Sequence, residues 1–364
     1  MSFLIVSCVM SGWLCAYSGT WLMRWLAPRI GLLDHPDPRK VHRQPIPLGG
    51  GLAILGGVVL PLVGLQVLLG LPEAWLVAWL PAELWRHKAG ALSRASALWS
   101  VVGGASVLSL LGLWDDWRPR PWGPRLAIQF LVAGFLVFSG VRATLFLQEA
   151  WLSGLVSLLW MVVLVNAFNF LDNMDGLCAG LGLIVSGLLA TMMLWAPGEP
   201  RVLVAGFFLL MAGSLAGFLC HNWYPARIFM GDAGSYFVGF SLAAMSLLGT
   251  YYTPESSRHH VVLSPLCVLA VPLYDFVSVV WLRWSEGRSP FQPDQRHFSH
   301  RLVKRGLHPI TAVLTIHLAT LTTGMGGLML YLVPTWGTAL IPLAMVGCVL
   351  LMIAVLESAP GTGA

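Results

Sequence analysis

Charged residues are scarce in this sequence. They make up only 10% of its 364 residues, whereas 57% are hydrophobic. Soluble globular domains carry about 25% charged residues, so this composition excludes an ordinary soluble protein. Cysteine is also sparse: the six cysteines form no CxxC pair and no cysteine–histidine cluster, which argues against a zinc site. The basic residues form no stripe with interleaved aromatics, so the net charge of +5 does not indicate a nucleic-acid partner.

Long apolar runs are what the sequence does contain. They match the ~20 helical residues that are needed to cross a bilayer, so we predict an all-α, polytopic integral membrane protein with one membrane domain over residues 1–364. The first run has no basic residue ahead of it and is too long for a signal-peptide core, so we expect a retained helix. The eleven expected transmembrane helices cover approximately residues 3–26, 49–70, 97–114, 124–141, 153–171, 177–195, 202–220, 233–252, 262–283, 310–332 and 338–356.

The basic residues between these spans predict the topology. The loops after the odd-numbered spans hold 13 lysines and arginines, and the opposite loops hold 6. Positive loops stay in the cytoplasm, so we expect the N-terminus outside and the C-terminus inside. Residues 71–96 fit this scheme least well, because they are long, partly apolar and basic, and we interpret them as a periplasmic interfacial helix.

Every unusual polar cluster falls on the same set of loops. These loops span residues 27–48, 115–123, 166–176, 221–232 and 284–309. Carboxylates, amides, histidines and bases at one membrane face predict a single active site that faces the cytosol, at the depth of lipid phosphates.

The stretch from Asn166 to Gly176 is the most polar part of this set. Asn166, Asn169, Asp172 and Asp175 recur every three residues, beside an apolar helix. An aspartate in the middle of a bilayer costs roughly 2.5 to 3.5 kcal/mol, so such residues persist where a cavity, a cation or a partner compensates them. A divalent metal with a polyanionic substrate would meet this requirement.

Two further carboxylate motifs have structural as well as functional interpretations. Asp115 and Asp116 end a predicted span, where one could ligate metal and the other act as a base, or both could be solvated charges that end the helix. Asp232 stands between two glycines, where backbone can approach a phosphate and a carboxylate can reach a hard cation. It could equally cap the eighth span.

Two basic motifs could bind phosphate. His297 and His300 lie one turn apart, close to Arg301, and such a group can grip a pyrophosphate. A basic interfacial helix that touches anionic lipids is the alternative. Lys40 could hold a nucleotide or lipid phosphate, or it could belong to a positive-inside anchor.

Taken together, these motifs resemble the polyprenyl-phosphate N-acetylhexosamine-1-phosphate transferase superfamily, also called glycosyltransferase family 4. The resemblance runs from about Asp34 to His308. It rests on the order and spacing of four signatures: Asp115-Asp116, NxxNxxDxxDGL at 166–177, FMGDAGS at 229–235, and the histidines at 297–300.

The resemblance implies a role for each matching position. Asp232 would be the principal Mg²⁺ ligand, with Asp172 as a second ligand and Mn²⁺ as an alternative ion. Asp115 would be the general base, and Asp116 would assist the metal and phosphate region. The positions that would bind substrate are Asn169, Asp172 and Asp175 at the nucleotide and diphosphate, Asn222, Phe229 and Lys40 at the uracil and ribose, and His297, His300 and Arg301 at the diphosphate.

The implied reaction is Mg²⁺-dependent transfer of N-acetylhexosamine 1-phosphate, with GlcNAc-1-phosphate favoured, from a UDP-sugar to undecaprenyl phosphate. This would release UMP and initiate a cell-surface polysaccharide. The lipid I synthase branch carries three adjacent histidines, whereas this chain has His-Phe-Ser-His, so a simple UDP-N-acetylhexosamine is favoured and lipid I synthesis is the alternative. A covalent aspartyl intermediate, an ion-coupled secondary transporter, an inert scaffold and a homodimer stay open.

Overall fold

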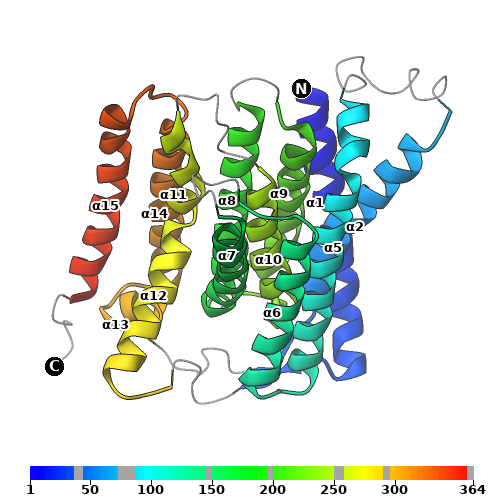
Figure 1. Ribbon diagram of the computed structural model, residues 1–364. Helices are drawn as coiled ribbons and strands as arrows, with labels where there is room; N and C mark the ends of the chain where they lie inside the picture. The colour runs from blue at the N-terminus through cyan, green and yellow to red at the C-terminus, as the bar shows by residue number, and fades with distance from the viewer. Residues whose placement is uncertain are drawn as a thin grey trace.

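Helices account for nearly all the regular structure in the computed structural model (Figure 1). The structure describes residues 1–36, 44–72, 87–143, 149–195, 200–249, 258–289 and 296–358. Within these residues two short strands, β1 (Leu33–Asp34) and β2 (Ile46–Pro47), pair antiparallel. The all-α, multi-pass prediction is therefore confirmed, and the small strand pair is an addition to it.

The helices follow the apolar runs of the sequence. Their bounds are α1 (Ser2–Leu26), η1 (Ala27–Ile30), α2 (Gly50–Leu69), α5 (Lys88–Trp117), α6 (Trp122–Phe138), α7 (Ala150–Leu171), α8 (Leu177–Leu194), α9 (Val202–Asn222), α10 (Gly231–Leu248), η2 (His259–Leu263), α11 (Ser264–Val268), α12 (Ala270–Ser285), α13 (Phe298–Lys304), α14 (Pro309–Met329) and α15 (Trp336–Ser358).

Each of the eleven expected spans corresponds to a helix or to a bent helix pair. In the described residues, eight helices are long and apolar enough to cross a membrane, and a bent pair makes a ninth. The other two are α6, which has only 17 residues, and α10, which begins with a glycine and Asp232. Length and composition alone therefore support fewer spans than the eleven that we expected.

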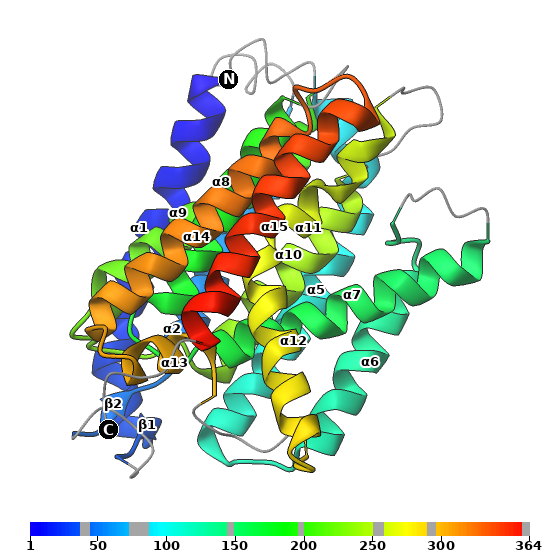
Figure 2. The same cartoon turned by 90° about the vertical axis from the view of Figure 1, so that its left-hand side faces the viewer.

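The ninth expected span is not one straight helix. Its two parts, η2 with α11 and then α12, meet at an angle of 65°. Pro272 lies in the first turn of α12 and has no N–H to donate to the carbonyl four residues earlier. The helical series of hydrogen bonds is therefore interrupted where α11 meets α12. Beyond the bend, α12 runs to the lower end of the bundle (Figure 2).

The third expected span begins earlier than we expected. Helix α5 starts at Lys88 and runs for 30 residues, so residues 88–96 continue a long helix and do not form a separate interfacial one. Residues 73–86, the rest of that interval, lie outside the described part of the chain.

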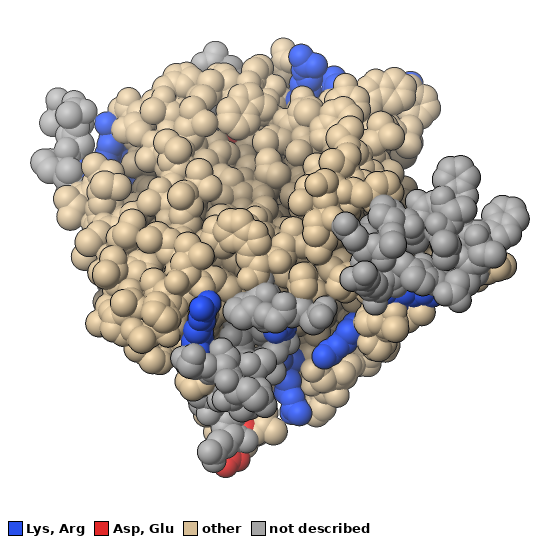
Figure 3. Space-filling view, turned by 90° about the horizontal axis from the view of Figure 1, so that it is seen from above, with Lys and Arg blue, Asp and Glu red and all other residues tan. Residues whose placement is uncertain are grey.

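The polar elements gather at one end of the bundle. Helix α1 begins at the opposite end, whereas α13 and the β1–β2 pair both lie toward the lower end in Figure 2. Seen from the end at which α1 begins, the visible surface is mostly neither basic nor acidic (Figure 3). Which side of the membrane each end faces stays a prediction.

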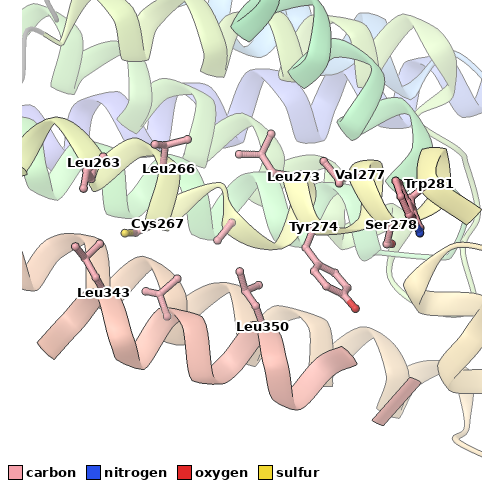
Figure 4. A pocket seen from close by; sticks show the side chains of 12 residues that line it. Leu263, Leu266, Cys267, Leu273, Tyr274, Val277, Ser278, Trp281, Leu343 and Leu350 are labelled. Carbon is pink, nitrogen blue, oxygen red and sulfur yellow. The ribbon is translucent and has the colours of Figure 1, made fainter. Parts of the chain in front are cut away.

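An apolar groove of about 670 Å³ lies on the flank of the bundle, between α11–α12 and α15 (Figure 4). Leu266, Leu273, Leu343 and Leu350 are among its lining residues, and Tyr274 stands toward one end. None of the predicted site residues lines it.

Candidate active site

Four helix ends meet at the predicted site. Helix α10 packs against α5, α7 and α2, and its first turn lies beside the last turns of α5 and α7. Helix α6 begins next to the end of α5 and supplies Arg125. The motifs at 115–116, 166–176 and 229–235 therefore converge, although Asp116 and Asp232 are 116 positions apart in the sequence.

Asp116 is bound to the start of α10. Its two carboxylate oxygens accept the backbone N–H groups of Asp232 at 2.8 Å and Ala233 at 3.2 Å. The first amides of a helix have no intrahelical partner, so this carboxylate caps α10 from a neighbouring helix. Asp116 thus fixes the position of Asp232. A further role of Asp116 at the metal and phosphate stays a prediction.

Glycine makes this close joint possible. Gly231 has φ +69°, and a Cβ atom there would lie 2.4 Å from a carboxylate oxygen of Asp116. On the other side, a Cβ at Gly112 would lie 2.4 Å from the carbonyl group of Asp232. Only residues without a side chain allow α5 and α10 to approach this closely.

Asp232 lies at the centre of a polar network. One oxygen of its carboxylate accepts from the Asn169 amide at 2.7 Å, and the other accepts from Arg125 at 2.9 Å. The Arg125 guanidinium also pairs with Asp115. The second Asp115 oxygen accepts the backbone N–H of Arg120 at 2.6 Å. One arginine therefore balances two of the predicted catalytic carboxylates.

Asp172 follows the last residue of α7 and faces the same cluster. Its carboxylate accepts the backbone N–H of Gly231. The pKa of Asp172 is raised to about 8, mainly by burial and then by the negative charge of Asp232. Asp34 and Asp175 act in the same direction. The site is therefore short of positive charge, as a cation-binding site would be.

The next carboxylate, Asp175, and the predicted nucleotide contact Asn222 brace the loop before α10. Asp175 accepts the backbone N–H of Ala226 at 2.9 Å. The buried Asn222 amide accepts from the N–H of Gly176 at 3.1 Å and donates to the carbonyl of Ile228 at 2.9 Å. These contacts are structural, and the predicted substrate contacts of both residues stay untested.

Phe229 is held through its backbone. Its N–H donates to the Pro47 carbonyl at 2.9 Å, and its carbonyl accepts the N–H of Gly50 at 3.1 Å. The first loop therefore joins the FMGDAGS string, and the Phe229 side chain is half-buried. Lys40, the other predicted contact in this loop, lies outside the described residues.

The histidine motif forms the start of α13. The ring Nδ1 of His297 lies 3.0 Å from Asp275 of α12, and His300 is its neighbour, with ring centroids 6.4 Å apart. Arg301 pairs with Glu357 of α15 at 2.9 Å and donates to Ser278 at 2.8 Å. The charge of Arg301 is thus compensated within the protein, and its diphosphate contact stays a prediction.

The last turn of α7 and the residues that follow it contact both the carboxylate cluster and the histidine motif. Ser299 of α13 donates to the Asn173 side chain at 2.7 Å. The Phe170 and His297 rings lie edge to face, with centroids 5.2 Å apart. Because Asn169 of the same stretch donates to Asp232, one short segment contacts both the carboxylate cluster and the histidine motif.

Our sequence analysis overlooked three residues in this region. Arg125 was counted only as a topological charge, and Asp275 and Glu357 were not considered. Each is a charged residue within or beside an apolar run, which is the signal that could have identified them.

Among the described residues, no three carboxylate, histidine or cysteine side chains form a ready-made metal cage. The site therefore offers a small number of carboxylates with polar support. Such a set matches Mg²⁺, which usually takes one or two protein carboxylates and completes its shell with water and substrate phosphates.

Comparison with known proteins agrees with this geometry. The model of the family described as glycosyl transferase family 4 matches residues 98–250, which include the carboxylate cluster. A Bacillus subtilis (strain 168) protein named "Probable undecaprenyl-phosphate N-acetylglucosaminyl 1-phosphate transferase" is 30% identical over 323 residues, which are 86% of this chain and 82% of the relative.

Two more relatives extend the comparison. The decaprenyl-phosphate N-acetylglucosaminephosphotransferase of Mycobacterium tuberculosis (strain ATCC 25618 / H37Rv) is 35% identical over 83% of this chain and 76% of its own length. The undecaprenyl-phosphate alpha-N-acetylglucosaminyl 1-phosphate transferase of Escherichia coli (strain K12) is 28% identical over 86% and 81%. The sequence identity extends along most of this chain and most of each relative, and the motifs lie at one end of a helical membrane bundle. The chain therefore belongs to glycosyl transferase family 4, the polyprenyl-phosphate N-acetylhexosamine-1-phosphate transferases.

Proposed function

We propose that this protein transfers GlcNAc 1-phosphate from UDP-GlcNAc to undecaprenyl phosphate, with release of UMP, as the first step of a cell-surface polysaccharide. The observation that carries the proposal is the joining of Asp115, Asp232 and Asn169 around Arg125 at one end of the bundle. The relatives above support the choice of sugar, because their names specify N-acetylglucosamine, and they support a polyprenyl phosphate acceptor.

The reaction occurs at phosphorus. An oxygen of the lipid phosphate attacks the phosphorus that carries the sugar, and the bond from that phosphorus to the bridging oxygen breaks, so that UMP leaves. Asp115 is the proposed base for any proton on the attacking phosphate. Arg125 holds Asp115 and Asp232 in position and supplies positive charge beside the reacting groups.

We further propose that Mg²⁺ binds at Asp232 and Asp172. The shortage of positive charge around Asp172 and the hard oxygen donors suit this ion. When bound, Mg²⁺ would neutralise charge on the diphosphate and the leaving group. In the structure both oxygens of Asp232 already bond to Arg125 and Asn169, so these side chains hold the carboxylate in a fixed orientation.

The proposed location is the bacterial inner membrane, with the site on the cytoplasmic side. The excess of basic residues at the polar end of the bundle supports this orientation. A cytoplasmic site would also have direct access to a nucleotide sugar. The homodimer stays a prediction without a structural argument.

The test is UMP release by the purified protein in lipid nanodiscs that contain undecaprenyl phosphate. UDP-GlcNAc, UDP-GalNAc and UDP-MurNAc-pentapeptide are supplied separately, with Mg²⁺, with Mn²⁺ or with a chelator. We expect UMP from UDP-GlcNAc only, and none after chelation. Release from UDP-MurNAc-pentapeptide would identify the lipid I branch instead.

A substitution separates catalysis from an inert scaffold. Asp232→Asn keeps the size of the side chain but removes its charge, so the folded variant should release no UMP. Full activity of this variant would contradict the proposed function. No UMP from any donor by the folded wild-type protein would favour a transporter, which ion-dependent uptake into proteoliposomes would then test.

A further inference from the structure

Asp275 is a buried carboxylate to which the proposed function gives no role. It lies in the middle of the apolar helix α12 and is fully inaccessible to solvent. One of its oxygens accepts the backbone N–H of Phe298 at 2.6 Å, and the other lies 3.0 Å from Nδ1 of His297. A buried carboxylate is costly unless both oxygens have partners, and both partners here belong to the start of α13.

This contact determines which nitrogen of His297 holds a proton. A carboxylate accepts hydrogen bonds, so Nδ1 of the ring must be the donor. Among the described residues, no group makes a hydrogen bond with the other ring nitrogen, Nε2. Nε2 is therefore the atom that His297 can offer to a ligand.

We propose that Asp275 is a positioning residue that keeps a proton on Nδ1 of His297 and balances the positive charge of the ring when Nε2 donates to a phosphate of the sugar nucleotide. The inference rests on the proposed function and deepens it. The chemical class of the ligand is a diphosphate, since a doubly protonated imidazole paired with a carboxylate makes a strong charge-assisted donor to phosphate oxygens.

The position of the ring supports this role. The His297 ring lies edge to face with the Phe170 ring. Phe170 directly follows Asn169, and the Asn169 amide donates to Asp232. The next turn of the same segment binds α13 through the Ser299–Asn173 hydrogen bond. His297 is thus held at the edge of the carboxylate cluster, where a diphosphate bound there would pass.

A simpler explanation is that Asp275 only caps α13. Two substitutions separate the two roles. Asp275→Asn keeps an oxygen for the Phe298 amide, but its NH₂ group would face Nδ1 of His297 and would force the ring proton to Nε2. Asp275→Ala removes both contacts. In Asp275→Asn, Nε2 keeps a proton, but the carboxylate charge that favours the doubly protonated ring is gone, so this variant tests the charge of His297.

The first experiment measures UMP release and thermal unfolding in nanodiscs. If Asp275 acts through His297, Asp275→Asn raises KM for UDP-GlcNAc about 10-fold or more, because a neutral ring is a weaker donor to phosphate than a charged one. The unfolding temperature of this variant stays that of the wild type. In the His297→Asn background the same change has no further effect. Wild-type activity of Asp275→Asn, or additive losses in the double variant, would overturn the proposal.

The second experiment does not require activity. The ¹⁵N spectrum of histidine-labelled protein reports which ring nitrogen is protonated, and the signals of His297 are those that disappear in His297→Gln. We expect protonated Nδ1 in the wild type and protonated Nε2 in Asp275→Asn. A wild-type ring without a proton on Nδ1 would overturn the proposal, even if Asp275→Asn failed to fold. Absence of UMP release by the wild type would contradict the proposed function, and the spectra would still decide the role of Asp275.

Discussion

Arg125 and Asp232 form an ion pair at 2.9 Å between the first turn of α6 and the first turn of α10. The same guanidinium group pairs with Asp115 at the end of α5. A single cation thus joins two of the carboxylates on which the proposed chemistry depends. Removal of Arg125 would leave two negative charges uncompensated in a partly buried site.

Replacement of Arg125 should therefore abolish most of the activity. We expect Arg125→Ala to reduce kcat/KM about 100-fold, since a fixed positive group beside the reacting charges is lost. Arg125→Lys should recover part of the activity, because one ammonium cannot reproduce the geometry of the guanidinium fork. Initial rates of UMP release measure this. Arg118→Ala is the matched control, since Arg118 is exposed and lies over the Trp117 ring. An equal loss of activity in Arg118→Ala would show a nonspecific effect of charge and would contradict this prediction.

A second prediction concerns the amide that orients Asp232. Asn169 donates to Asp232 at 2.7 Å and to Ser235 at 3.2 Å. Asn169→Ala should lower activity about 10-fold through the lost hydrogen bond. Asn169→Asp should lower it further, because it places a second negative charge against Asp232. If Asn169→Asp were the more active variant, the assigned orientation of this amide would be wrong. Rates at saturating and low UDP-GlcNAc distinguish binding from turnover.

The bracing role of Asn222 predicts a stability defect. Asn222→Ala would leave the Gly176 N–H and the Ile228 carbonyl without their partner, at a cost of about 3 kcal/mol. We expect a lower unfolding temperature together with lost activity. Thermal unfolding in nanodiscs checks this. Wild-type stability with weakened nucleotide binding would instead support direct contact between Asn222 and the substrate.

Gly231 should tolerate no side chain. Its left-handed backbone costs another residue about 1 to 2 kcal/mol, and a Cβ would clash with Asp116. Gly231→Ala should therefore displace Asp232 and remove activity, even where the protein still folds. Gly187→Ala in α8 is the control, since no atom lies within 4 Å of a Cβ there. An active Gly231→Ala variant would show that the joint between α5 and α10 can adjust.

Much of the fold could be predicted from composition. Apolar runs of the length of a membrane identify helices, because every backbone group in lipid must find its partner within the segment. The bend before α12 was missed, although Pro272 marks it. Hydropathy shows that a segment is apolar, but it does not show whether the helix axis is straight or bent. The start of α5 was missed because Lys88 and Arg94 interrupt the apolar pattern without interrupting the helix.

The site shows a similar division. Asp115, Asp172 and Asp232 could be grouped from the sequence, because the predicted topology places all three at the same membrane face. The structure brings their motifs together. The partners of these residues could not be predicted. Arg125, Asp275 and Glu357 contact residues on other helices, and Arg125 reaches Asp232, which is 107 positions away. The apolar pattern of one sequence does not show which helix faces which.

The capping of α10 by Asp116 has a mechanical consequence. Backbone amides and a carboxylate join α5 to α10, so Asp115 and Asp232 move as one unit, and the distance between them changes little when the bundle deforms. Helix α13 is joined to α12 by one bond of the same kind, from the Phe298 N–H to Asp275, and to its other neighbours by side chains such as Ser299 and Arg301. We therefore expect the spacing of the Asp115 and Asp232 carboxylates to stay the same when sugars of different size bind, so that differences in substrate size are accommodated elsewhere in the site.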